Sequence, residues 1–200
     1  LECPVVPYRH TLRAHRRLPR PVPEEELSRF FAVIKGSRDR AIFLLMLRCG
    51  LRISEVSHLK LQDLYLDEPR PRLLISGKGS KERSVYVSRQ ALLALRRYLR
   101  ERPASDSDAV FLNYQLDGLA TIGIQKRLEA YREEAGLHLT AHQLRHNFAS
   151  DLVAANVPVT SIQKLMGHTW VTTTQAYIAA NDPKVQADFY EAVKQLEGWQ

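Results

Sequence analysis

The sequence contains little cysteine and no long apolar run. Its two cysteines, Cys3 and Cys49, are too few for a disulfide framework or a cysteine metal cluster. The longest apolar run, Ala41 to Leu47, is much shorter than the roughly 20 residues that cross a bilayer, so it predicts a core helix. Internal repeats and low-complexity segments are also absent. These features exclude a disulfide-rich scaffold, a membrane-spanning protein and a repeat protein, and they favour a reducing, intracellular compartment.

Positive charge exceeds negative charge along the chain. Lysine and arginine number 29 against 22 aspartate and glutamate residues, which gives a formal net charge of +7. Because 44% of the residues are hydrophobic, the chain can bury a core and is expected to fold. A basic, folded chain most often binds a polyanion, and nucleic acid is the commonest one. The alternative is a basic protein that binds nothing acidic.

Residues 1–23 are rich in arginine and proline, which predicts a basic arm or linker rather than a packed element. Such an arm can become ordered on a DNA backbone, and a solvated connector is the alternative. The chain begins with Leu1 rather than Met, so we expect a fragment of a longer protein or a minimal variant. The arginines of the arm are Arg9, Arg13, Arg16, Arg17 and Arg20.

The rest of the chain predicts a mainly α-helical fold with one small antiparallel β-sheet. Two strands are expected at 72–76 and 83–87, joined by a glycine-containing turn. Apolar residues at helical spacing predict the other elements as helices, and Ser54 is expected to cap a short one. The longer helices are expected to begin near residues 24, 38, 88, 121, 141, 158, 172 and 183.

One domain is expected at residues 24–182, followed by a separate C-terminal helix within 183–200. Val185, Phe189 and Val193 are spaced to bury one face of that helix. The spacing fits docking on the helix's own domain and docking on a neighbouring protomer equally well.

The first candidate functional residues lie on the helix expected at 141–155. His142 and Arg145 are three residues apart and therefore share a face, which His146 extends. This basic face is expected opposite an apolar stripe that includes Leu144 and Phe148. A basic helix face taken alone is usually just solvated, so this pair does not by itself indicate catalysis.

Three further features are equally ordinary when each is taken alone. Arg52 comes two residues after a glycine break at Gly50, and Glu55 lies three residues on, as in an ion pair near a turn. Lys78 lies in the glycine-containing turn, where solubility would explain it. His168 follows a glycine at a helix end and Tyr177 comes nine residues later, but most tyrosines are half-buried packing residues.

Together these four segments resemble the tyrosine site-specific recombinase (phage integrase) family in order, spacing and local sequence. The segment from Gly50 resembles that family's G-L-R-x-S-E-L, and the turn at 77–83 resembles its G-K-G-x-K-x-R. The stretch 142–152 resembles H-x-L-R-H-x-x-A-x-x-L, and 166–177 resembles L-G-H followed by T-T-x-x-Y, with Met166 in place of leucine. The match covers most of residues 24–180 and implies the fold of that family's catalytic domain.

The resemblance also implies roles for individual residues. Tyr177 matches the nucleophile, which would form a 3′-phosphotyrosine bond, and Glu55 matches a supporting acid. The residues that match the surroundings of the scissile phosphate are Arg52, Lys78, His142, Arg145 and His168. Further DNA contacts are expected from the arm and from Lys81, Arg83 and His146.

The same resemblance implies breakage and rejoining of double-stranded DNA without a metal, ATP or another cofactor, as in DNA integration by mobile genetic elements. It implies a homotetramer on DNA, with a monomer when alone, no membrane partner, and a cytoplasmic, nucleoid-associated location in a bacterial or phage-like setting. A type IB topoisomerase or telomere resolvase is one alternative, and a DNA-binding module that has lost catalysis is another. A covalent DNA adduct that depends on Tyr177 separates an enzyme from a silent module.

Overall fold

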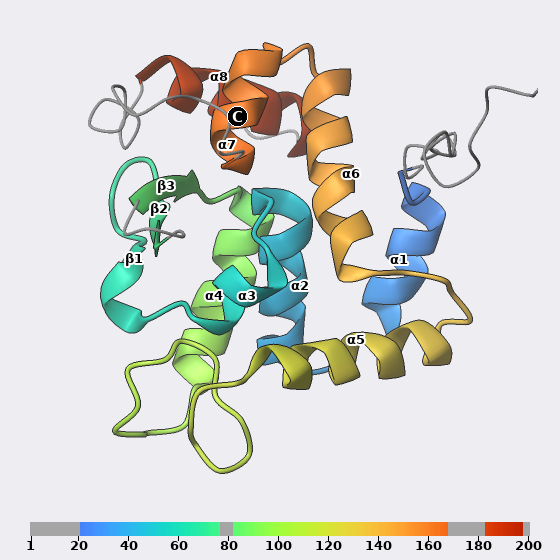
Figure 1. The fold of residues 1–200 in the computed structure, drawn as a ribbon, viewed down its shortest axis with the longest axis vertical. Coiled ribbons are helices and arrows are strands. Elements are labelled where there is room, and N and C mark those ends of the chain that lie inside the picture. Colours follow the sequence, from blue (N-terminus) through green and yellow to red (C-terminus); the bar gives the residue numbers. More distant parts are fainter. Residues whose placement is uncertain (1–20, 77–81, 168–182, 198–200) are drawn as a thin grey trace, which may run out of the picture.

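The computed structural model describes residues 21–76, 82–167 and 183–197 (Figure 1). The helix expected near 172, nearly all of the basic arm and the centre of the expected turn lie outside these described residues. Within them, helices dominate and three short strands form one antiparallel sheet, which confirms the expected fold class. None of the described helices has the length and apolar character needed to cross a membrane.

Helix α2 (Ser37–Cys49) lies at the centre of the larger hydrophobic core (Figure 1). Its residues 41–47 are all buried, as expected for a helix segment that is apolar on every side. The apolar run in the sequence is therefore the core helix that it predicted. The helices around it are α1 (Glu24–Val33), α4 (Arg89–Glu101), α5 (Thr121–Glu134) and α6 (Ala141–Ala154).

The sheet has the strand order β1-β2-β3, and both strand pairs are antiparallel. Its strands are β1 (Leu64–Tyr65), β2 (Arg72–Ser76) and β3 (Glu82–Tyr86). In the β2–β3 pair, Leu73 lies opposite Val85 and Ile75 lies opposite Arg83. This pair confirms the expected hairpin. Strand β1 was not predicted, because two residues are too few to show the alternation that marks a strand.

A second hydrophobic cluster joins α6 to α7 (Val159–Met166) and α8 (Pro183–Glu197). Phe148 from α6, Leu165 from α7 and Phe189 from α8 are buried in it. Helix α8 also contacts α4. In the described residues, the C-terminal helix thus packs on α4, α6 and α7 of the same chain.

Candidate active site around Glu55

A left-handed turn at Gly50 ends α2 and directs the chain toward the site. Gly50 has a φ of 68°, which residues with a Cβ atom rarely adopt. A Cβ atom added there would also lie 2.4 Å from Cδ1 of Phe148. Glycine is therefore required both by the backbone and by the packing of α6. Arg52 lies two residues later, at the start of the short helix α3 (Ile53–Ser57).

Glu55 closes the first turn of α3. Its Oε2 atom accepts a hydrogen bond of 2.7 Å from the backbone N–H of Arg52, and its Oε1 atom accepts one of 2.9 Å from Nη1 of the same residue. The ion pair expected from the spacing is therefore confirmed. The expected cap at Ser54 is wrong, because Ser54 lies inside α3 and the Glu55 carboxylate satisfies the backbone N–H at the helix start.

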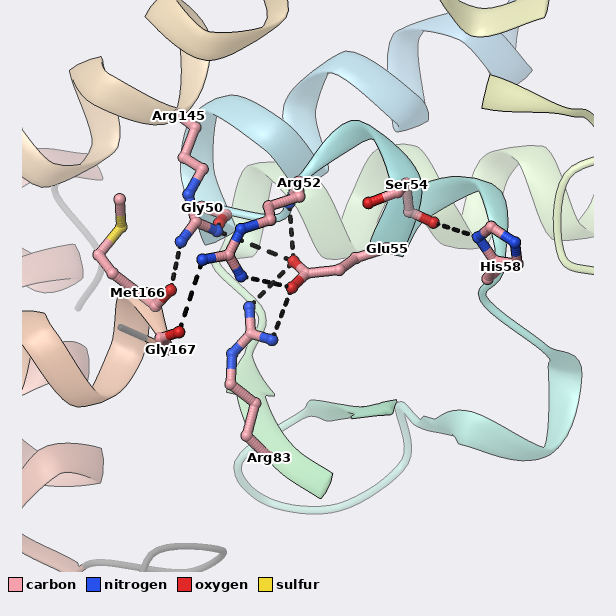
Figure 2. A network of polar contacts seen from close by, with 9 residues as sticks. All are labelled: Gly50, Arg52, Ser54, Glu55, His58, Arg83, Arg145, Met166 and Gly167. Atoms are coloured by element: carbon pink, nitrogen blue, oxygen red, sulfur yellow. Dashed lines mark hydrogen bonds and ion pairs between the residues drawn. The ribbon is translucent and has the colours of Figure 1, made fainter. Parts of the chain in front are cut away.

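Arg83 on β3 contacts the same carboxylate. Its Nη1 atom donates to Oε1 of Glu55 over 2.8 Å, and its Nη2 atom donates to Oε2 over 3.0 Å. This is the two-pronged arrangement in which a guanidinium binds a carboxylate most strongly. Figure 2 shows Arg52 and Arg83 reaching Glu55 from two separate segments. Glu55 thus links α3 to the hairpin.

Arg145 on α6 is the most buried of the three arginines. Its guanidinium donates to the backbone carbonyls of Gly50 and Met166, which lie at the ends of α2 and α7 (Figure 2). Its Nη1 atom also lies 3.8 Å from Oε2 of Glu55. Arg145 therefore holds three helices together at the site as well as contributing charge to it.

Gly167 brings the end of α7 to the same place. It ends α7 in a left-handed conformation with a φ of 59°, and its carbonyl accepts a hydrogen bond of 3.5 Å from Nη2 of Arg52. A Cβ atom at Gly167 would lie 2.8 Å from Nε of Arg83. The lack of a side chain lets the backbone of α7 contact both arginines, immediately before His168 in the sequence.

The site carries an excess of positive charge, since three guanidiniums surround one carboxylate. Burial alone would raise the pKa of Glu55, but the hydrogen bonds and charge of Arg83, and then those of Arg52, lower it to about 2. Burial and then the charge of Arg52 lower the pKa of Arg145 to about 10, against the opposing effect of Glu55. Glu55 and Arg145 are therefore both charged near neutral pH, and because the guanidiniums outnumber the carboxylate, the cluster can bind an anion.

Solvent reaches the members of the cluster unequally. The Arg52 side chain is 43% exposed, whereas the side chains of Arg83 and Arg145 are 16% and 5% exposed. Arg52 is therefore the arginine that an incoming anion would meet first.

The described part of the chain holds no group of three or more histidine, cysteine, aspartate or glutamate side chains that could bind a metal ion.

The structure brings together Arg52, Glu55 and Arg145 from the expected site. His142 is exposed in the first turn of α6, and within the described residues it has no hydrogen bond to this cluster. His146 is half-buried, with Nδ1 lying 3.2 Å from Oγ of Ser150. The expected site residues outside the described part of the chain are Lys78, Lys81, His168, Tyr177 and the arginines of the arm.

Two features of the site could not be read from the sequence. Arg145 was expected on a basic face of α6 opposite the apolar stripe, and this expectation is wrong. Arg145 is only 4% exposed, because α6 packs against the ends of both α2 and α7. Arg83 was expected among DNA contacts, but in the structure its guanidinium is paired with Glu55. These residues are 28 positions apart, and neither spacing nor composition signals such a pair.

The chain is similar in sequence to known proteins. A sequence model described as the phage integrase family matches residues 21–184 of this chain. A tyrosine recombinase XerC from Alcanivorax borkumensis is 35% identical over 177 residues, which cover 82% of this chain and 57% of that protein. A tyrosine recombinase XerA from Thermococcus kodakarensis is 37% identical over 169 residues, covering 81% of this chain and 58% of that protein. The chain thus spans little more than half the length of these relatives.

Solved structures show the same fold. The crystal structure of XerA recombinase has a TM-score of 0.71 and 26% identity, covering 88% of this chain and 65% of that one. The XerH site-specific recombinase bound to its difH substrate has a TM-score of 0.67 and 28% identity, covering 81% of this chain and 51% of that one. The resemblance read from the four sequence motifs is therefore confirmed.

Proposed function

We propose that this chain, which belongs to the phage integrase family, breaks and rejoins double-stranded DNA through a covalent bond between Tyr177 and a 3′-phosphate. The observation that carries the proposal is the convergence of Arg52, Arg83 and Arg145 on the single carboxylate of Glu55. The backbone of Gly167, from which the chain continues toward Tyr177, contacts this cluster. The names of the relatives, tyrosine recombinases, point to the same chemistry.

Arg52 and Arg145 would bind the two non-bridging oxygens of the scissile phosphate. Charge increases on these oxygens in the transition state, and fixed guanidiniums stabilise it without reorganising. Arg145 uses two of its donors on the carbonyls of Gly50 and Met166, and a guanidinium has five N–H groups. The remaining donors of Arg145 and the exposed guanidinium of Arg52 supply the proposed phosphate contacts, with His168 as a further donor.

Tyr177 would attack the phosphorus, and the bond to the 5′-oxygen would break. A phenol has a pKa near 10, so it needs a cationic pocket and a base to react at neutral pH. We assign His142 as the acceptor of the phenol proton and Lys78 as the donor of a proton to the leaving 5′-oxygen. The resulting 3′-phosphotyrosine keeps the phosphate reactive, so an incoming 5′-hydroxyl can reverse the step. The reaction then needs neither ATP nor a metal ion.

The wider setting is part of the same proposal. Residues 24–182 would be the catalytic unit, with the basic arm at 1–23 contributing contacts to the DNA backbone. Similar solved structures include one described as XerH bound to difH, which supports double-stranded DNA as the partner. Assembly into a tetramer on DNA is proposed from the family resemblance. The location would be that of the DNA itself, the nucleoid of a bacterial cell.

The experiment uses duplex DNA of random sequence in which every molecule carries a nick in one strand. Cleavage close to the nick releases a short fragment that diffuses away, so the covalent intermediate cannot be reversed and accumulates. We expect a complex that survives denaturing electrophoresis, and sequencing its DNA would identify the preferred site. Tyr177→Phe should form none, whereas Tyr114→Phe, at a tyrosine that is 89% exposed and far from the cluster in sequence, should react normally.

Absence of the complex with the native chain, or its persistence in Tyr177→Phe, would contradict the proposal. If the chain binds the DNA pool but never becomes covalently attached, it is a silent binding module. If it relaxes supercoiled DNA without exchanging strands, the type IB topoisomerase alternative is correct.

A further inference from the structure

We infer that Arg83 is a positioning residue that holds the Glu55 carboxylate, and through it Arg52, in place for the reaction, and that it does not contact DNA. The inference rests on the function proposed above. It replaces the expectation, drawn from the sequence, that Arg83 binds DNA directly. Three structural observations support it: the direction of the Arg83 fork, the sharing of one oxygen atom, and the contact with Gly167.

The fork of Arg83 points into the protein. Both terminal nitrogens donate to Glu55, over 2.8 and 3.0 Å, and the Glu55 side chain is only 9% exposed. The third nitrogen, Nε, is buried against the backbone of Gly167. Arg83 is thus enclosed between Glu55 and the end of α7, whereas the Arg52 side chain is 43% exposed to solvent. A phosphate could approach Arg52 from its exposed side, but it could reach both prongs of the Arg83 fork only by breaking the pair with Glu55.

Arg52 and Arg83 bind the same oxygen atom. Oε1 of Glu55 accepts from Nη1 of Arg52 and from Nη1 of Arg83, and the two-pronged contact of Arg83 fixes the plane of the carboxylate (Figure 2). The position of the Arg52 guanidinium therefore depends on Arg83 through Glu55. Without Arg83, Glu55 would keep its two hydrogen bonds from Arg52, but the pair would lose its anchor on β3, and the orientation of Arg52 toward the phosphate would be less restrained.

Arg83 also connects the cluster to the hairpin. It lies on β3, opposite Ile75 of β2, and β3 follows the segment that contains Lys78. A displacement of β3 would therefore move the Glu55 carboxylate and, with it, Arg52. Arg83 in this way links the strand next to the proposed general acid with the arginines that bind the phosphate.

The experiment compares Arg83→Gln with Arg72→Gln in the full chain, on the duplex recovered from the random pool. Arg72 lies on β2 of the same sheet with a similar exposure of 20%, and it pairs with Glu68 away from the cluster. At saturating DNA we expect Arg83→Gln to slow covalent complex formation by about 10- to 100-fold, the loss that small misplacements of catalytic groups produce. Arg72→Gln should react at the native rate. Arg83→Lys keeps the charge but not the fork, so its rate should be intermediate.

The dependence of DNA binding on salt separates positioning from DNA contact. Each lost phosphate contact reduces the slope of log K against log salt by about 0.9. Measured in the Tyr177→Phe background, where no cleavage interferes, Arg83→Gln should leave this slope unchanged. A slope reduced by about one unit, with a native rate at saturating DNA, would overturn the inference and restore Arg83 as a DNA contact.

The outcomes also separate this inference from the proposed function. If the native chain forms no Tyr177-dependent complex, the function itself fails. If the native chain reacts and Arg83→Gln reacts equally fast, only the role of Arg83 fails. Thermal unfolding of each variant identifies a folding defect, and if Arg83→Gln does not fold, a native rate in Arg83→Lys overturns the inference instead.

Discussion

Replacing Gly50 by alanine tests how the turn before Arg52 is built. An alanine held in the left-handed conformation at φ 68° should lower the free energy of unfolding by about 1 to 2 kcal/mol. The added Cβ would lie 2.4 Å from the ring of Phe148, and such overpacking of a core adds about 1 to 3 kcal/mol. The total is about 2 to 5 kcal/mol, which corresponds to a fall in Tm of roughly 4 to 20 °C for a domain of this size.

Gly136 provides a matched control, because it separates the backbone effect from the clash. It follows α5 with a φ of 64°, but a Cβ atom there would meet nothing within 4 Å. Gly136→Ala should therefore lower the free energy of unfolding only by the backbone contribution, about 1 to 2 kcal/mol. Urea unfolding of both variants measures the difference. Equal destabilisation by the two substitutions would refute the claim that Gly50 is required by the packing of Phe148.

Two further predictions concern the charge of Glu55 and the attachment of the N-terminal segment. The pKa of Glu55 falls from 4.5 to about 2 on folding, so its contribution to stability is fully present above pH 4.5 and is lost as the pH falls toward 2. Urea unfolding at several pH values should show that Glu55→Gln removes this acid dependence of stability. The control Glu134→Gln, at the exposed end of α5, should keep it. Identical pH profiles of stability for the native chain and Glu55→Gln would contradict the lowered pKa of Glu55. The buried amide of Asn147 accepts from the backbone N–H of Val22 over 2.9 Å and donates to its carbonyl over 2.8 Å. Asn147→Ala should therefore lower the free energy of unfolding by about 1 to 3 kcal/mol and let the Val22 amide exchange its hydrogen with solvent. Unchanged protection of that amide would show that other contacts hold the chain at Val22.

Much of the fold could be predicted because local patterns determine it. The apolar run at 41–47 forms the buried centre of α2, and the strand expected at 72–76 is β2. The start of α6 is also determined locally, because Oγ1 of Thr140 accepts a hydrogen bond of 3.2 Å from the backbone N–H of Gln143. Strand β1 was missed, because its two residues form a strand only by pairing with β2.

The candidate site was predicted in part. The pair of Arg52 and Glu55 lies within one helical turn, so spacing alone indicated it. The burial of Arg145 follows from the packing of three helices, and the pairing of Arg83 with Glu55 joins a helix to a strand. Such contacts depend on the tertiary arrangement, which the spacing of residues along one element does not report.

The proposed chemistry is tested most directly by identifying the residue that becomes attached to DNA. The complex formed on the recovered duplex is digested, and mass spectrometry locates the nucleotide-bearing peptide. We predict a 3′-phosphate linkage on Tyr177, formed on the order of 100- to 1,000-fold more slowly when Arg52 is replaced by glutamine. A linkage on another residue, or an unchanged rate in Arg52→Gln, would contradict it.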